Sequence, residues 1–257
     1  MPSGSGPAAD RIEHRLTPAV LIRGEATPVF SLEERMAFLK VPAVSIAVIN
    51  NGEIEWARAY GMADLGEGRP ATTNTRFHAA SISKPVTATA VLKLVDEGRL
   101  DLDADVNRYL TTWQVPASEH AHGKPVTLRE IMTHTAGITV GGFPGYARTA
   151  DIPTLVGVLD GMGNTPPVRV DTTPGANYRY SGGGYTVMQL MLAEIGGQPF
   201  ARLLDDWVLN PVGMTLSTFE QPLPAPRWDE AASGYLADGS PVEERWNVDP
   251  EQAAAGL

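Results

Sequence analysis

The most reactive arrangement in the sequence is a serine three residues before a lysine, in Ser81-Ile82-Ser83-Lys84. A free serine hydroxyl is a weak nucleophile and needs a neighbouring proton acceptor. At the start of a helix, residues three apart lie on one face, so Ser81 and Lys84 can share a hydrogen bond. Burial of a lysine amine favours its neutral form, which can take the serine proton. The spacing therefore fits catalysis through an acyl-enzyme on Ser81.

The same pair also fits a purely structural interpretation. The chain has eleven serines and four lysines, so one pair at this spacing is weak support for catalysis by itself. In the structural interpretation, Ser81 caps its helix and Lys84 is solvated. A Ser-His-Asp hydrolase of the G-x-S-x-G type is disfavoured, because the sequence contains no such nucleophile elbow.

The segment from Ser81 to Val95 must be helical if the pair is to meet. Val91, Leu92, Leu94 and Val95 form an apolar face, and Gly98 supplies a helix end. A second clear helix is predicted over 185–195, before Gly196-Gly197. The rest of residues 100–216 predicts short helices separated by Pro and Gly.

The strands predicted by the sequence lie on either side of this helical block. The apolar run 44–49 and the alternating run 54–60 flank Asn50-Asn51-Gly52, which predicts a β-hairpin. A weak strand or hairpin is predicted over 235–242. Residues 1–10 are predicted to be a flexible leader, and a helical segment carries Leu32, Met36 and Leu39.

A two-stranded hairpin cannot bury its faces alone and needs further strands or a packed helix. The sequence ends at A-A-A-G-L, residues 253–257, without strands that would complete a sheet. We therefore expect the 257 residues to be one domain that is truncated at its C-terminus, with a leader and first helix in 1–30, the hairpin in 41–60 and a helical lobe in about 77–220.

Composition excludes several classes of function. The net charge of −10 disfavours general nucleic-acid binding. Because the chain has no cysteine, disulfides and thiolate chemistry are excluded. The N-terminus lacks an apolar signal core and no window approaches a membrane span, so we expect no membrane span and a cytoplasmic location, or a periplasmic one if an export signal precedes these residues.

Four segments in order resemble a known family. Residues 77–84 (F-H-A-A-S-I-S-K) resemble the F-x-x-A-S-[IV]-[ST]-K nucleophile segment of class C β-lactamases, D-alanyl-D-alanine peptidases and β-lactamase-like esterases. The segments 127–138, 174–188 and 210–214 are similar to that family's T-[IL]-x-x-L-L-x-H-T-[AS]-G, P-G-x-x-x-x-Y-S-N-x-G-Y and P-L-G-M stretches. The chain is thereby identified as resembling the serine β-lactamase and penicillin-binding-protein superfamily, whose fold is α+β: an antiparallel sheet flanked by helices, with an all-helical lobe.

The resemblance implies roles for the second motif. Tyr180 would move a proton between Ser81 and the leaving group, and Tyr178 is its local competitor. Ser181 and Gly182 would lie at the substrate. Gly182 stands where the β-lactamases carry an asparagine that contacts the substrate amide, so β-lactam turnover is disfavoured and ester hydrolysis less so.

The family's third motif, [KH]-[ST]-G downstream of the tyrosine, is not present in these residues. The last lysine is Lys124 and the last histidine is His134. Without the second oxyanion donor from that strand, a rate loss of about 10²–10³ is expected. We regard a fragment as the better explanation than a degenerate gene.

Other polar clusters are weaker candidates. His120 and His122, with Glu119, could form a metal pair, but their Pro/Gly/Ala loop favours a solvated turn. The D-L-D-A-D run 101–105 lacks the rest of a calcium loop. His134 is expected to make structural hydrogen bonds between helices.

The sequence therefore predicts a serine hydrolase of ester or amide carbonyls, with Ser81, Lys84 and Tyr180 as catalytic residues. It predicts no metal, no cofactor, and a small-molecule ester, peptide or β-lactam substrate; the oligomeric state is open. The alternatives are a non-catalytic penicillin-binding-like module, an inactive fragment, or a half that completes its sheet with another polypeptide.

Overall fold

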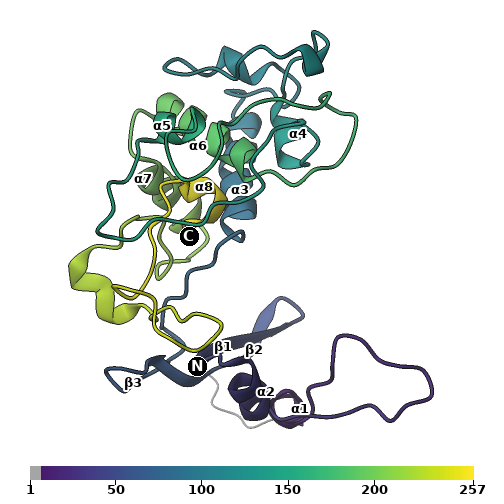
Figure 1. The fold of residues 1–257 in the computed structure, drawn as a ribbon, viewed down its shortest axis with the longest axis vertical. Helices are drawn as coiled ribbons and strands as arrows, with labels where there is room; N and C mark the ends of the chain where they lie inside the picture. The colour runs from purple at the N-terminus through teal and green to yellow at the C-terminus, as the bar shows by residue number, and fades with distance from the viewer. Residues whose placement is uncertain (1–6) are drawn as a thin grey trace. The chain divides into compact units, whose positions relative to one another are not determined.

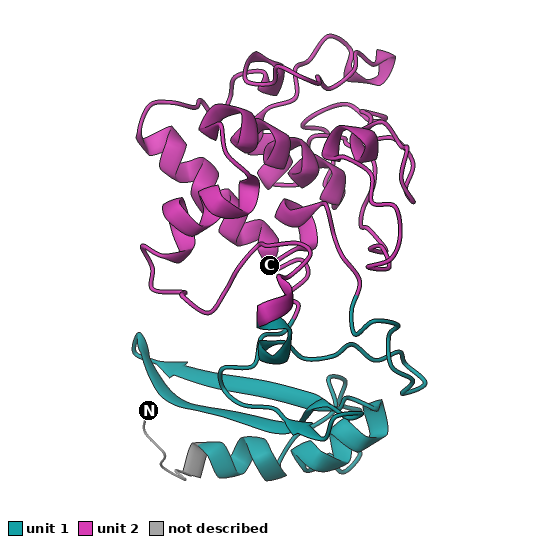
Figure 2. Cartoon of the chain, turned by 90° about the vertical axis from the view of Figure 1, so that its left-hand side faces the viewer, with its two compact units in different colours: residues 1–77, 227–246 teal, residues 78–226, 247–257 magenta. Residues whose placement is uncertain are grey.

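A computed structural model describes residues 7–257. The chain separates into two compact units, one formed by residues 1–77 with 227–246 and the other by 78–226 with 247–257 (Figure 2). Residues 1–6, part of the predicted leader, lie outside the described residues. Residues 7–10 are not a leader, since they begin helix α1 (Pro7–His14).

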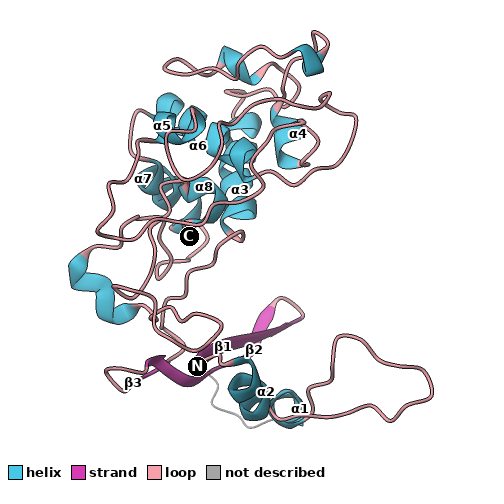
Figure 3. Ribbon diagram, in the orientation of Figure 1, coloured by secondary structure: helices cyan, strands magenta, loops and turns pink. Residues whose placement is uncertain are grey.

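The first unit contains the predicted hairpin. Strands β1 (Ala43–Asn50) and β2 (Glu53–Asp64) pair antiparallel, and β3 (Arg69–Pro70) adds to β2 in the order β1-β2-β3 (Figure 3). Asn51 and Gly52 both have positive φ, 51° and 79°, which matches the twist that a two-residue hairpin turn requires. The hairpin prediction is confirmed.

Helix α2 (Leu32–Leu39) also belongs to this unit and confirms the predicted helical segment. Its start is fixed by a capping box, in which the Ser31 hydroxyl accepts the Glu34 N–H and the Glu34 carboxylate accepts the Ser31 N–H. The predicted strand or hairpin over 235–242 takes a minimal form, in which Tyr235 and Pro241 make a single antiparallel bridge around a turn. The Leu236 N–H bonds the Ser240 carbonyl and the Val242 N–H bonds the Gly234 carbonyl.

The second unit is helical and holds the larger core. Around its longest helix, α6 (Gly182–Gly196), pack α3 (Ser83–Asp96), α4 (Leu128–Met132), α5 (Leu155–Leu159), α7 (Phe200–Leu204) and α8 (Gln252–Ala255) (Figure 1). Residues 205–209 continue from α7 as a π-helical turn, and 3₁₀ turns span 106–108, 119–121 and 225–230, of which the last has only residues 225–226 in this unit.

Helix α6 is central and mostly apolar, with Thr186 and Gln189 as its buried polar side chains. All residues from Gly182 to Leu192 are buried, as expected of a helix surrounded by others. Its predicted end at Gly197 is confirmed, where φ is 62°. Its start precedes the predicted one by three residues, since Ser181 caps the helix at Gly184 N–H.

Among residues 7–257, no helix is both long enough and apolar enough to cross a membrane. The described elements combine helices with a small antiparallel sheet, which is the predicted α+β class.

Candidate active site

Ser81 lies in a tight turn directly before α3. The N–H groups of Ile82, Ser83 and Lys84 each bond the carbonyl three residues earlier, and the first α-helical residue is Ser83. The predicted helix start at Ser81 is therefore early by two residues. Residues 81 and 82 instead form the tighter turn with three-residue hydrogen bonds, and Ala80 before them has a left-handed φ of 46° that keeps the helix from extending further back.

Three side chains meet at the Ser81 hydroxyl. The Lys84 ammonium donates to Ser81 Oγ at 3.1 Å, and the Tyr180 hydroxyl donates to the same oxygen at 2.7 Å. The turn geometry, rather than a helical face, brings Ser81 and Lys84 together. All three residues lie within the helical unit. The arrangement provides a hydroxyl nucleophile with two neighbouring groups that can exchange its proton.

Lys84 is held in place by a second contact. Its side chain is only 5% exposed, and its ammonium donates to the Ala254 carbonyl oxygen at 2.7 Å. The interpretation that Lys84 is solvated is thereby wrong, and its catalytic role stays a prediction. Because a buried amine needs partners, the two acceptors fix its position next to the serine.

Tyr180, rather than Tyr178, reaches the serine. Tyr178 is 70% exposed, whereas Tyr180 is 38% exposed and its ring lies 4.9 Å from the Lys84 nitrogen. Burial raises the pKa of the Tyr180 phenol, but hydrogen bonds with Lys84 and Ser81 and the charge of Lys84 outweigh burial. The net result is a pKa below the ordinary tyrosine value, which suits proton exchange.

A pocket of about 800 Å³ opens at these groups. Lys84 is the one charged side chain, with His134 neutral, among the described residues that line it. The remaining lining is mostly apolar: Ala79, Ile82, Pro85, Ala88, Leu92, Met132, Tyr180 and Tyr185, together with Ser81. Such a pocket suits an uncharged organic group next to the nucleophile.

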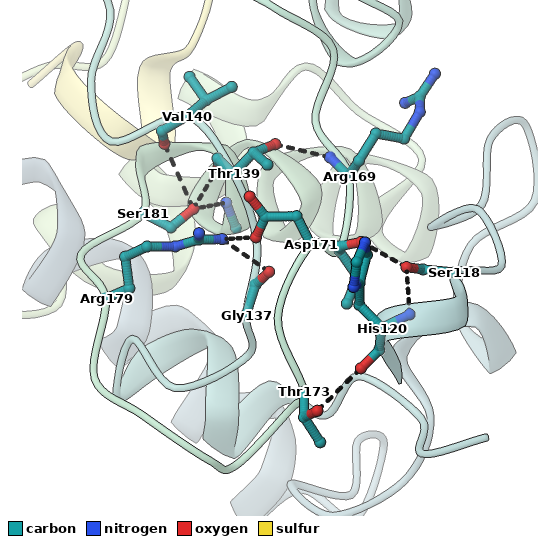
Figure 4. A network of polar contacts seen from close by, with 12 residues as sticks. Ser118, His120, Gly137, Thr139, Val140, Arg169, Asp171, Thr173, Arg179 and Ser181 are labelled. Carbon is teal, nitrogen blue, oxygen red and sulfur yellow. Dashed lines mark hydrogen bonds and ion pairs between the residues drawn. The ribbon is translucent and has the colours of Figure 1, made fainter. Parts of the chain in front are cut away.

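Ser181 and Gly182 occupy the start of α6. The Ser181 hydroxyl is buried, accepts the Gly184 N–H and donates to the Thr139 carbonyl at 2.9 Å (Figure 4). The structure thus gives this hydroxyl a capping role, and a substrate contact by Ser181 or Gly182 stays a prediction.

Gly182 has a packing reason to lack a side chain. A Cβ at this position would lie 3.0 Å from the Phe143 ring and 3.2 Å from the Gly141 oxygen. A larger residue here, such as the asparagine of the family pattern, would require Phe143 to move. The departure from that pattern is therefore accommodated by a neighbouring aromatic ring.

The network beside Ser181 fixes the segment that carries Tyr180. Arg179 forms an ion pair with Asp171 and donates to the Gly137 carbonyl at 2.9 Å (Figure 4). Gly137 has φ of 68°, and a Cβ there would lie 2.1 Å from the Thr172 oxygen. The close approach of these two segments depends on that glycine.

Sequence reasoning missed three features of the site. The first is the contact of His134 with Tyr180. The second is the hydrogen bond from Lys84 to the Ala254 carbonyl. The third is His78, which bonds Asp249 at 3.1 Å and the Ala255 carbonyl at 2.6 Å. Hydrogen bonding to Asp249 raises the pKa of His78 despite burial. The last two contacts join residues about 170 positions apart, so no local pattern could have indicated them.

Among the weaker candidates, the backbone of His120 and the side chain of Asp103 make local contacts. The His120 carbonyl accepts from Thr173 and its N–H bonds Ser118 within a 3₁₀ turn (Figure 4). Asp103 pairs with Arg129 through two bonds of 2.7 and 2.8 Å. In the described part of the chain, no three His, Cys, Asp or Glu side chains are grouped to hold a metal ion.

Comparisons with known proteins agree with this architecture. The family model described as Beta-lactamase matches residues 31–257. Esterase EstB of Burkholderia gladioli is 34% identical over 185 residues, which cover 68% of this chain and 46% of the relative. The putative penicillin-binding protein PbpX of Bacillus subtilis is 27% identical over 199 residues, with 75% and 45% covered.

A solved structure named D-alanine carboxypeptidase AmpC from Burkholderia cenocepacia superposes with a TM-score of 0.66 at 25% identity, over 88% of this chain and 57% of that one. The chain thus spans less than half the length of the two curated relatives that it matches here.

Proposed function

The chain belongs to the beta-lactamase family, and on that premise we propose that it acts as a serine hydrolase that cleaves small, uncharged esters through an acyl-enzyme on Ser81. The observation that carries the proposal is the convergence of Lys84 and Tyr180 on the Ser81 hydroxyl oxygen. A hydroxyl that only capped a helix would not need both groups.

The proposed reaction has two steps. In the first, Ser81 Oγ attacks the ester carbonyl carbon, its proton passes to the Lys84–Tyr180 pair, and Tyr180 returns a proton to the departing alkoxide. In the second, water attacks the acyl carbon and gives its proton to the same pair, which returns a proton to the departing Ser81 oxygen, so that the acid and the free serine are released. The Ser81 N–H, which bonds no acceptor within residues 7–257, would donate to the oxyanion.

Two features favour an ester over a β-lactam or a D-alanyl peptide. Gly182 offers no side-chain amide to recognise a substrate amide, and the pocket lining is mostly apolar. EstB, which is named an esterase, is 34% identical to this chain. An ester makes the smallest demand on amide and carboxylate recognition.

Labelling tests this function directly. We expect a fluorophosphonate probe to add to Ser81, as located by peptide mass spectrometry, and short p-nitrophenyl esters to be hydrolysed. Ser81→Ala should remove the adduct, while Ser83→Ala, whose hydroxyl bonds the Ala80 carbonyl and lies two residues away, should keep it. A folded protein without an adduct on Ser81 would rule the proposal out.

A second candidate is a penicillin-binding-like module that acylates without turnover. It is supported by the similarity to the putative penicillin-binding protein PbpX, which is 27% identical over 199 residues. Penicillin would then form a lasting adduct on Ser81, with no release of product over hours, whereas an esterase would release acid continuously.

Tyr180→Phe is expected to slow ester hydrolysis by about 10²-fold, because the variant loses the hydroxyl that lies 2.7 Å from Ser81 Oγ. The matched control is Tyr178→Phe, two residues away and 70% exposed, which should keep wild-type rates. Steady-state kinetics with p-nitrophenyl butyrate measures both. Equal losses in the two variants would contradict the assignment of Tyr180.

A further inference from the structure

His134 contacts the segment of Tyr180 from both sides. Its carbonyl oxygen accepts the Arg179 N–H at 2.7 Å, and its Nδ1 accepts the Ser181 N–H at 3.1 Å. The two donors are the neighbours of Tyr180 in sequence. One residue therefore fixes the backbone immediately before and immediately after the tyrosine.

The imidazole also packs on the phenol itself. The ring centroids of His134 and Tyr180 are 4.4 Å apart with planes inclined by 33°, and Tyr185 lies 5.5 Å from the same imidazole. His134 has a left-handed φ of 58°. This conformation ends helix α4, since the His134 N–H bonds the Ile131 carbonyl and the Thr135 N–H bonds the Glu130 carbonyl.

The hydrogen bond defines the state of the ring. Because Nδ1 accepts from a backbone N–H, the proton of the neutral imidazole lies on Nε2. Burial, with the charge of Lys84 as the second cause, lowers the pKa of His134 below its ordinary value. The neutral ring is thus the form that fits near neutral pH.

We propose that neutral His134 is a positioning residue, which holds the Tyr180 phenol against the Ser81 hydroxyl by clamping residues 179–181 and stacking on the ring. This role rests on the proposed esterase function. It differs from a general structural role between helices, because it assigns His134 an effect on the rate of the proton transfer.

Protonation of His134 should break its hydrogen bond with the Ser181 N–H. The groups around the ring are the ammonium of Lys84 from α3, the phenols of Tyr178 and Tyr180 from the segment before α6, and that of Tyr185 from α6 itself. A protonated Nδ1 would point a donor at the Ser181 donor and add a positive charge near Lys84. Activity should therefore fall as the pH drops through a value below that of free histidine.

Two substitutions separate the hydrogen bond from the ring. His134→Asn keeps an acceptor near the Nδ1 position, does not titrate, and tolerates a left-handed φ. His134→Phe keeps an aromatic ring but loses the acceptor. His120→Asn, at an exposed histidine in the same unit, serves as the control.

We expect His134→Phe to lower kcat by about 10–100-fold with KM nearly unchanged, as for a misplaced catalytic group. His134→Asn should recover most of this kcat and should lack the acid limb of the pH profile that wild type and His120→Asn show. Rates of fluorophosphonate labelling of Ser81 provide a second readout, and thermal melts show whether each variant is folded.

Wild-type kcat in both variants, or an acid limb that persists unchanged in His134→Asn, would overturn the positioning role. If His134→Phe does not fold, the pH profile of His134→Asn decides alone. A wild-type protein that forms no Ser81 adduct would overturn the proposed function and this role together, whereas normal labelling with unchanged variants overturns this role only.

Discussion

Replacing Lys84 by methionine is expected to slow ester hydrolysis by about 10³-fold, within the range for loss of a general base or acid. The ammonium is the single side-chain cation bonded to Ser81 Oγ within residues 7–257, and it also lowers the pKa of Tyr180 through a hydrogen bond and its charge. Methionine has a similar length and no charge, so the variant removes the chemistry and preserves most of the packing.

Lys93→Met is the matched control. Lys93 lies on the same helix, pairs with Glu97 at 2.7 Å and is partly exposed, so its replacement should leave the rate within about 2-fold of wild type, as for surface changes. The measurements are kcat/KM for a p-nitrophenyl ester and the rate of Ser81 labelling. Lys84→Met with near wild-type values in both would contradict the mechanism.

Folding of Lys84→Met must be verified, because the substitution leaves the Ala254 carbonyl without its donor. An unpaired buried acceptor costs about 1–3 kcal/mol. Chemical denaturation separates this loss from the chemical effect, since a folded variant at the assay temperature has lost only its catalytic amine.

Glu251→Gln is expected to stabilise the protein at alkaline pH. The Glu251 side chain is fully buried, and neither carboxylate oxygen has a hydrogen-bond partner in the part of the chain that the structure describes. Burial raises its pKa to about 7, and the charge of Asp249 contributes in the same direction. Above that pH the folded protein must carry an unpaired buried anion.

The raised pKa of Glu251 determines how the unfolding free energy depends on pH. The folded state holds the Glu251 proton more tightly than the unfolded chain does, so the stabilisation is full below an ordinary glutamate pKa and is lost as the pH rises through 7. The loss amounts to about 3 kcal/mol. Glutamine does not titrate, so the variant should match wild type near pH 4.5 and exceed it by up to about 3 kcal/mol at pH 8.

Urea denaturation between pH 4.5 and 8.5 measures the effect. Glu119→Gln, at an exposed carboxyl on the surface of the same unit, should leave the pH profile of the unfolding free energy unchanged. If the unfolding free energies of wild type and Glu251→Gln depend on pH in the same way, the pKa of Glu251 is not raised in the folded protein.

Local patterns located the hairpin and the two longest helices. The hairpin around Asn51-Gly52, the helix that follows Ser81 and the helix that ends at Gly197 all depend on turn residues and apolar periodicity within about fifteen residues. The errors are also local: the tight turn at residues 81–82 delays the start of α3, and Ser181 starts α6 early by capping it.

The sequence motifs indicated the three side chains that meet at the Ser81 hydroxyl. Ser81 and Lys84 are close in sequence, and the family resemblance selected Tyr180 over Tyr178. The sequence did not indicate that His134 clamps residues 179–181 or that Phe143 packs against Gly182, because these contacts are set by how distant segments meet. A histidine in a T-H-T-A-G segment carries no sequence signal for the tyrosine it touches.

Side chains in residues 78–84, at and before the start of α3, form hydrogen bonds with residues 253–257. Besides the Lys84 contact to Ala254, the Ser83 hydroxyl accepts the Leu257 N–H at 2.9 Å, and His78 bonds the Ala255 carbonyl. If acylation of Ser81 changes the contact of Lys84 with Ala254, thermodynamic linkage requires that opening of the turn around α8 changes the free energy of acylation by the same amount. Amide hydrogen exchange at Leu257 would then change on labelling of a residue 176 positions earlier in the sequence.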